Sequence, residues 1–481
     1  MFQVRKKTVA FALALLSVVP VYAHTAADAE ISELRRELHE QLKHIKDSYE
    51  RRIAALESRL AHAEVSAAES KADIKSVAMK TEASAFTSAP TPAASGEGAF
   101  NPAVSLILAG NYTRLSRDPN HHQIGGFIPT QGEVAPPARS FSLGESELSI
   151  SANIDPLWRG QFTASVPAEG GGMEIEEAYI QTLDLGHGAT FKAGRFLSSI
   201  GYLNSRHAHV WDFADAPLAY KAFFGGQLKN DGVQLKWLAP TDLWLELGAE
   251  LSRGGPFPST DNSSNGSGLA ALYAHVGGDA GLSSSWRAGL SYVGASPRDR
   301  AYEDSDSLGA AIENRYSGRS RMAVADFVWK WAPQGNARET NFKLQGEYFR
   351  RTESGTLASN SAAGACGGDC LGDYTARQWG AYLQGVYQFA PTWRLGLRYD
   401  RLGSGATSIG LVDSGVLSNA DLPLLARNDP KRGSVMLDWS PSEFSRIRLQ
   451  FARDESRFAQ PDNQFWLQYI VSLGAHGAHK Y

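Results

Sequence analysis

Residues 393–400 read WRLGLRYD, and their alternation decides the fold. Large apolar side chains occupy every second position: Trp393, Leu395, Leu397 and Tyr399. The positions between them carry mostly charge: Arg394, Arg398 and Asp400. A period of two residues is that of a β-strand with two unlike faces, and not that of a helix. The same alternation recurs in about sixteen runs, which start between residues 103 and 463.

The connections between these runs alternate in length. Short ones such as APT (239–241) and SPS (440–442) separate long ones at 115–140, 197–226, 295–319, 351–373 and 403–431. Tryptophans gather at the strand ends, as at Trp158, Trp237, Trp329, Trp379, Trp393 and Trp439. Alternating strands, unequal connections and aromatic girdles are typical of a membrane barrel. We predict an all-β transmembrane barrel of about 16 antiparallel strands; a secreted soluble solenoid or sandwich is the alternative.

The ends of the chain define four segments. Residues 1–23 combine Arg5, Lys6 and Lys7 with an apolar run and a small-residue cleavage pattern, which is typical of a signal peptide. Residues 24–65 are predicted to be a periplasmic coiled coil, residues 66–98 a flexible linker of Ala, Ser, Thr and Pro, and residues 99–481 the outer-membrane barrel. An even strand number places both barrel ends on the periplasmic side.

The predicted coiled coil has an eleven-residue period. Ile31, Leu42 and Ile53 mark successive repeats of a narrow apolar seam on an otherwise charged helix. Eleven residues over three turns give about 3.67 residues per turn, and therefore a nearly straight bundle. Such a seam favours self-association; a single helix lying on the chain's own surface is the alternative.

Composition excludes several classes of function. The 47 Lys+Arg and 51 Asp+Glu residues nearly cancel, so nothing favours nucleic acid as a partner. No catalytic motif with a known mechanism is present, and we expect no enzyme activity. Cys366 and Cys370 are the chain's 2 cysteines, and in an exported protein they are expected to form a disulfide.

The chain resembles a proteobacterial outer-membrane porin family with an N-terminal coiled coil. The resemblance rests on FNPAVSLIL (100–108), EEAYIQT (176–182), AGRFLSSIGYLNSRHAHVWDFADAPL (193–218) and DGVQLKWLAPTDLWLELGAE (231–250). The family is similar in layout to phosphate-selective porins, and its members are often labelled zinc-regulated TonB-dependent outer-membrane receptors. Energy-coupled receptors have a plug domain and about 22 strands, whereas residues 24–98 indicate a helix and a linker. We therefore interpret the chain as a passive channel.

The resemblance gives the loop at 197–226 a role. In sixteen-stranded porins the corresponding loop folds inward and narrows the pore, which would place Arg206, Asp212, Asp215 and Lys221 in the water path. Strand parity points further charges into the lumen: Glu145, Glu147, Arg394, Arg398, Arg446 and Arg448. These charges either set ion preference or pair with one another across the wall.

Four histidines lie in two outer loops: His121, His122, His207 and His209. Histidine is a common metal ligand, so they are candidates for zinc binding, and solvated loop histidines are the alternative.

The predicted function is passive diffusion of small hydrophilic solutes or ions. The alternatives are a zinc-related receptor or uptake protein, and a barrel that anchors the coiled coil. We expect no cofactor unless zinc is a transported or loop-bound ion. The expected partners are outer-membrane lipid, further copies of the chain in a trimer, and the cell wall through the coiled coil.

Overall fold

The computed structural model describes residues 102–474, apart from 131, 133, 167–171, 260–264, 364, 365, 367 and 368. The chain divides into two units, Met1–Gly96 and Glu97–Tyr481. The predicted signal peptide, coiled coil and linker lie outside the described residues.

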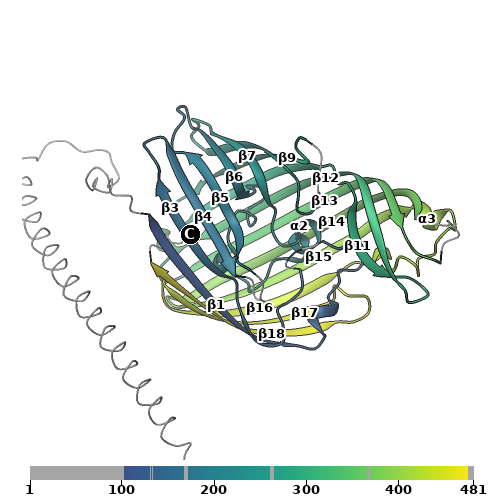
Figure 1. Ribbon diagram of the computed structural model, residues 1–481. Coiled ribbons are helices and arrows are strands. Elements are labelled where there is room, and N and C mark those ends of the chain that lie inside the picture. The colour runs from purple at the N-terminus through teal and green to yellow at the C-terminus, as the bar shows by residue number, and fades with distance from the viewer. Residues whose placement is uncertain are drawn as a thin grey trace, which may run out of the picture. The chain divides into compact units, whose positions relative to one another are not determined.

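The second unit is a single antiparallel sheet (Figure 1). Its strands are β1 (Ala103–Leu115), β2 (Ser140–Leu143), β3 (Ser146–Asn153), β4 (Trp158–Val166), β5 (Glu174–Thr182), β6 (Ala189–Leu197), β7 (Lys229–Leu238), β8 (Trp244–Ser252), β9 (Leu269–Ala280), β10 (Ser284–Ala295), β11 (Arg300–Ser305), β12 (Ala311–Trp331), β13 (Asn341–Ser359), β14 (Cys370–Ala390), β15 (Trp393–Ile409), β16 (Lys431–Ser442), β17 (Ser445–Asp454) and β18 (Asp462–Gly474).

The sheet closes on itself because β1 pairs with β18 from Ser105↔Gly474 to Leu115↔Gln464. At two places in the wall, two successive strands together occupy the position of one. β2 and β3 both pair with β1, and β10 and β11 both pair with β12, so the 18 strands form 16 positions around the barrel. The wall is therefore a closed barrel of 16 antiparallel strands, which confirms the predicted barrel and its strand number.

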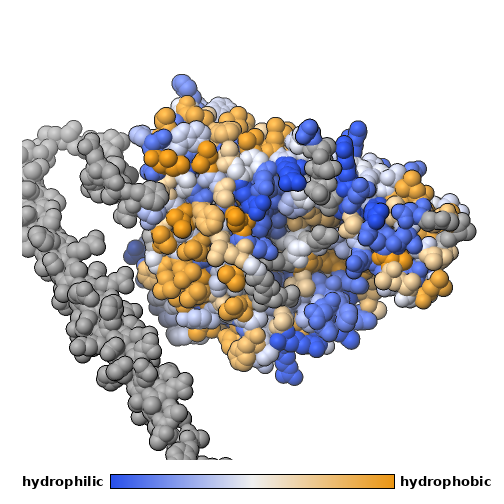
Figure 2. Space-filling view, in the orientation of Figure 1, coloured by the Kyte–Doolittle hydropathy of each residue, from blue (hydrophilic) through white to orange (hydrophobic). Residues whose placement is uncertain are grey.

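The two faces of each strand differ as the alternation predicts. On β14, Leu383, Tyr387 and Phe389 point outward and are 56%, 42% and 48% exposed. The intervening Gln384 and Gln388 point inward and are buried. Figure 2 shows hydrophobic side chains gathered on the barrel surface over β3 to β7. An apolar outer face and a polar inner face are the arrangement that a membrane barrel requires.

Aromatic side chains gather at the strand ends beside the short turns. Trp393 of β15 stacks on Trp439 of β16 with ring centroids 6.1 Å apart, and Trp329 of β12 contacts the ring of Phe342 of β13 at 5.9 Å. Tryptophan and tyrosine favour the boundary between hydrocarbon and water. The rings therefore mark the edge of the apolar band.

The long connections are shorter than the sequence indicates. Residues 295–319 contain all of β11 and the start of β12, while β13 and β15 continue to Ser359 and Ile409. These extensions carry small and polar residues on both faces, as in TESGT (352–356). Alternation identifies a strand only where one face is apolar, so hydrated hairpins give no such signal.

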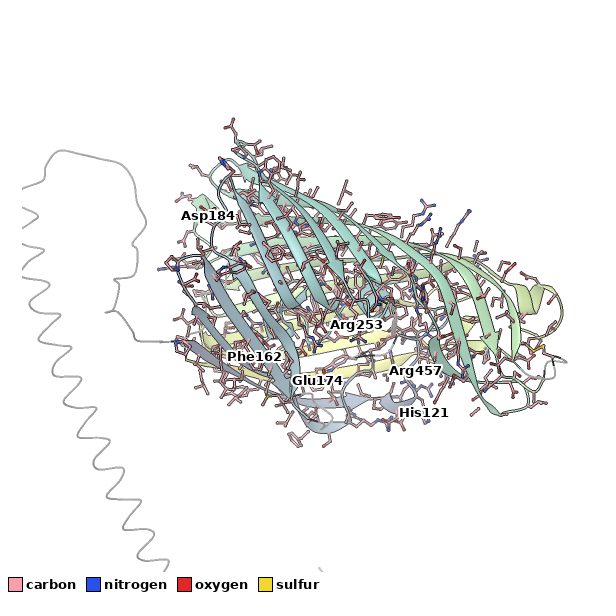
Figure 3. The ribbon with its side chains drawn as sticks, turned by 45° about the horizontal axis from the view of Figure 1, so that its top comes forward. His121, Phe162, Glu174, Asp184, Arg253 and Arg457 are labelled. Carbon is pink, nitrogen blue, oxygen red and sulfur yellow. A yellow bond between two sulfur atoms is a disulfide. The ribbon has the colours of Figure 1, made fainter. Side chains whose placement is uncertain are left out.

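Two short α-helices lie in the long connections, α2 (Leu218–Phe224) and α3 (Gly410–Asp413). No helix among the described residues is long and apolar enough to cross a membrane. Figure 3 labels His121 and Arg457 at the end of the barrel that carries the long connections, and Asp184 in a short turn at the other end.

Candidate functional site

The connection between β6 and β7, residues 198–228, packs against the inner face of the barrel. We call it the inner segment; it contains the 3₁₀ turn η2 (Ala208–Val210) and α2. Every residue of α2 is buried. Its Phe223 ring stacks on Phe349 of β13 at 5.9 Å, and Tyr220 contacts the same ring at 5.2 Å. These contacts place the helix on the lumen side of the wall.

Glycine in the wall allows this close approach. A Cβ at Gly380 of β14 would lie 2.6 Å from Leu402, 2.8 Å from Phe223 and 3.2 Å from Ala219. The helix is also held at its start, where the Leu218 N–H donates to Asp400 Oδ1 at 2.9 Å. Its end at Gly225 uses a left-handed backbone, with φ of 70°, which favours glycine.

Asp212 is the first charged anchor of the inner segment. It forms ion pairs with Lys343 of β13 and with Arg394 of β15, whose Nη1 lies 3.2 Å from Asp212 Oδ1. Gln384 Nε2 donates to Asp212 Oδ2 at 2.9 Å. Burial alone raises the pKa of Asp212, but the positive charges of Lys343 and Arg394 outweigh it and hold the pKa below its usual range. The carboxylate is therefore ionised and neutralised by the wall.

Asp215 is the second charged anchor. Arg398 Nη2 lies 2.9 Å from Oδ1, Lys221 Nζ lies 3.2 Å from Oδ2, and Arg432 Nη1 also pairs with Oδ2. Gln450 Nε2 donates to Oδ1 at 3.1 Å. Burial raises the pKa of Asp215, yet the cations around it, chiefly Arg432 and Lys221, lower it well below its usual value.

The sequence places Asp212, Asp215 and Lys221 in the water path, and the structure instead holds them between the inner segment and the wall. Asp212 is 4% exposed and Lys221 is 3% exposed. The reason is electrostatic: the wall offers arginine and lysine side chains opposite each carboxylate, and an ionised group leaves water only when it is paired. Arg206 differs from these three, because it lines a cavity and stacks over the Tyr202 ring at 4.3 Å.

All four arginines that strand parity points into the lumen contact the inner segment. Arg394 and Arg398 hold the two aspartates. Arg448 Nη2 donates to the Trp211 carbonyl at 2.7 Å, and Arg446 Nη1 donates to the same carbonyl at 3.4 Å. Pairing across the wall was one of the two alternatives that the sequence left open, but the acids behind these arginines on the wall, Asp400 and Asp438, were not predicted. Arg398 Nε donates to Asp400 at 3.0 Å, and Arg448 Nε donates to Asp438 at 2.8 Å.

The histidines of the inner segment contact glutamates of the opposite wall. His207 Nδ1 lies 3.2 Å from Glu147 Oε2 of β3, and its Nε2 lies 3.0 Å from Glu177 Oε2 of β5. His209 Nδ1 lies 2.9 Å from Glu147 Oε1. Burial lowers the pKa of His207, but the hydrogen bonds and charges of Glu147 and Glu177 raise it well above its usual value. Glu145, which was predicted together with Glu147, lies in the break between β2 and β3.

The two histidines of the connection between β1 and β2, His121 and His122, differ in their surroundings. His121 is exposed, and its Nδ1 lies 3.8 Å from Asp118. Burial, together with the charges of Lys221 and Arg457, lowers the pKa of His122 to about 3. Within the described part of the chain, no group of three or more His, Cys, Asp or Glu side chains is placed to hold a metal ion. Cys366, in the connection between β13 and β14, forms a disulfide with Cys370, the first residue of β14.

A cavity of about 890 Å³ lies between the inner segment and the short-turn end of the lumen. Five cationic side chains line it: Arg206, Lys330, Lys343, Arg394 and Arg446. Three acidic side chains line it: Asp212, Asp279 and Glu443. Asp212 is already paired with Lys343 and Arg394. The cavity therefore carries an excess of positive charge, which favours anions at its surface.

No family model matches the chain. Among solved structures, the chain is similar to a loop L8 deletion mutant of OmpT, an outer membrane protein of Vibrio cholerae, at 11% identity and a TM-score of 0.47, over 78% of this chain and 99% of that one. It is also similar to the anion-selective porin from Comamonas acidovorans, at 8% identity and a TM-score of 0.46, over 78% and 99% of the two chains. The outer membrane channel DcaP of Acinetobacter baumannii matches at 13% identity and a TM-score of 0.42, over 78% and 96%.

A protein of Aquifex aeolicus (strain VF5), named only as an uncharacterized protein, is 30% identical over 413 residues, which cover 80% of each chain. Our chain belongs to the same protein family as this Aquifex aeolicus protein.

Proposed function

We propose that the protein is an outer-membrane porin through which small anionic solutes diffuse passively. The observation that carries this proposal is the cavity at the short-turn end, where five cations face three acids. The inner segment would narrow the water path above the cavity, because it occupies part of the lumen and is held by Asp212 and Asp215. The activity is transport, and no catalytic step is proposed.

The outer-membrane location rests on the barrel's two faces. Side chains such as Leu290, Leu383 and Leu397 expose 68%, 56% and 62% of their surface on the outside. Burying them in hydrocarbon is favourable, since each Å² of apolar surface removed from water contributes about 25 cal/mol. We further propose that the chain forms a trimer and that the predicted coiled coil clamps it or reaches the cell wall.

Two cavity-lining cations offer a test of anion preference. Arg206 and Lys330 form no ion pair with any described carboxylate, unlike Lys343 and Arg394. Replacing both by Gln should remove positive charge without breaking the pairs that hold the inner segment. In planar bilayers under a KCl gradient, the wild type should prefer chloride, and the Arg206→Gln/Lys330→Gln variant should shift the reversal potential towards cations. An unchanged reversal potential would contradict the proposed role of the cavity.

A second candidate is a barrel that only anchors the predicted coiled coil. It is favoured by an apolar cluster at the long-loop end, which includes Phe257, Tyr316, Leu357, Leu411 and Leu424. Such a cluster fills lumen volume that an open channel leaves to water. The same bilayer measurement decides between the two candidates: an anchor gives no single-channel steps. Zinc uptake is a weaker candidate, because the described residues assemble no group of metal ligands.

A further inference from the structure

A groove runs along β12 on the outward face of the barrel. Its volume is about 510 Å³. Its floor is formed by Ala323 and Ala325, two outward positions of β12. Its walls are formed by larger side chains of the two neighbouring strands: Leu290 and Tyr292 of β10, Tyr348 and Arg350 of β13.

The strand register explains why the groove is hollow. Ala325 lies opposite Leu290 on one side and Tyr348 on the other. Ala323 lies opposite Tyr292 and Arg350 in the same way. A methyl group therefore lies between two large side chains in two successive rows, and the depression follows the strand. The strands that carry its walls, β10 and β13, lie about 10 Å apart across β12, and these walls are mostly apolar apart from Arg350 and the two tyrosine hydroxyls.

Arginines continue the groove towards the long connections. The next outward positions of β12 are Arg321 and Arg319, and both are exposed. Thr352 of β13 lies opposite Arg321 on one side and opposite Arg377 of β14 on the other. Adjacent strands are about 4.8 Å apart, so Arg321 and Arg377 are separated by about 10 Å. We call Arg319, Arg321, Arg350 and Arg377 the arginine cluster.

The arginine cluster has no counter-charge within the described part of the chain. Other outward cations do: Arg453 Nε lies 2.9 Å from Glu455, and Arg195 Nε lies 2.6 Å from Asp231. Four like charges on three adjacent strands repel one another unless an anion binds among them. Guanidinium groups bind phosphate oxygens in a two-point geometry, which makes phosphate a suitable anion.

The position of the cluster points to lipid. Tyr348, on the groove wall, stacks on Trp379 with ring centroids 6.3 Å apart, and this aromatic pair lies next to Arg350 in the register. Aromatic side chains on the outside of a membrane barrel mark the headgroup level. The groove floor therefore lies at this level, since Ala325 shares a row with Tyr348, and Ala323 shares a row with Arg350 and Trp379. The other three arginines lie beyond it, on the side of the long connections.

We propose that the groove and the arginine cluster bind a phosphorylated glycolipid of the outer leaflet. One acyl chain lies along Ala323 and Ala325, and the phosphates bind among the four guanidinium groups. The long connections are on the same side as the cluster, which corresponds to the outer leaflet if the barrel lies in the outer membrane as proposed above. A cluster about 10 Å wide matches several phosphates rather than the single phosphate of a glycerophospholipid.

The test compares lipid binding by full-length variants folded in detergent. Arg321→Gln/Arg350→Gln/Arg377→Gln removes three of the four charges of the cluster, and Ala325→Leu fills the groove. Arg453→Gln is the matched control, because it removes an outward cation that already has a partner. Native mass spectrometry with added purified bisphosphorylated glycolipid should show at least tenfold weaker binding for the first two variants and wild-type binding for the control.

Several results would overturn this assignment. One is glycolipid binding that survives in both variants. Another is equal binding of the dephosphorylated glycolipid, or of phosphatidylglycerol, to the wild type. A third is an Ala325→Leu variant that changes the oligomer size while glycolipid binding stays constant, because the groove would then be an interface between copies. Conductance of the same samples separates this proposal from the channel: a wild type that binds glycolipid without single-channel steps contradicts only the channel.

Discussion

Removing the charge of Asp215 should loosen the inner segment far more than removing an exposed charge. Asp215 lies 2.9 Å from Arg398 and 3.2 Å from Lys221, and it also pairs with Arg432. Asp215→Asn leaves these cations without their shared anion in a buried position. Breaking a buried pair in this way costs about 3–5 kcal/mol. The free energy of unfolding of the barrel should fall by about this amount. The loss cannot exceed the free energy of docking of the inner segment, because beyond that point the segment undocks and the barrel remains folded.

The matched control is Asp231→Asn. Asp231 pairs with Arg195 at 2.6 Å, but the two side chains are 49% and 39% exposed. An exposed pair contributes about 0.2–1 kcal/mol. The two variants therefore make the same chemical change with an expected difference of at least about 2 kcal/mol.

Three measurements follow the change. Urea titration with folded and unfolded barrel separated by gel mobility gives the free energy of unfolding. Limited proteolysis and single-channel recording report on residues 198–228 directly, since release of the inner segment should expose cleavage sites and raise conductance. If Asp215→Asn behaves like Asp231→Asn in all three, the buried network does not hold the inner segment, and the reasoning fails.

Two further predictions concern the same segment. The glutamate partners of His207 raise its pKa well above 6.5, so the stability that protonated His207 contributes to docking is fully present below pH 6.5 and is lost as the pH rises through the raised pKa. Proteolysis of residues 198–228 should therefore increase at alkaline pH. His207→Gln should flatten this pH dependence, and the control His121→Gln, at an exposed histidine, should leave it unchanged. Gly380→Val should weaken docking by about 1–3 kcal/mol through overpacking against Phe223, whereas Gly433→Val, with nothing within 4 Å of its new Cβ, should leave the urea midpoint near the wild-type value.

Strand parity predicted more of this molecule than any motif did. The two-residue period located the strands and pointed Arg394, Arg398, Arg446 and Arg448 to the inside, where the structure has them. Parity gives the direction of a side chain and says nothing about what lies opposite it. The pairing of Asp212 with Lys343 joins residues 131 positions apart in sequence, and a pattern within one strand contains no record of such a contact.

The residues of the inner segment show the same limit. Their mixed charge indicated a hydrated loop, because charge usually signals contact with water. The outcome depended on the charges of distant strands, and these become neighbours only when the sheet closes. The groove along β12 was likewise invisible, since Ala323 and Ala325 look like ordinary strand residues until the register places large side chains on either side.

The distance in sequence between the inner segment and its anchors has a consequence for assembly. Asp215 can pair with Arg398 and Arg432, which follow it by 183 and 217 residues, only after those residues are in place. Contacts between such distant residues form late, because the whole intervening chain must first be ordered. The inner segment therefore docks only after β15 and β16 have joined the sheet. Until then Asp212 and Asp215 lack their partners on the wall, and the growing barrel carries an undocked segment whose carboxylates still face water.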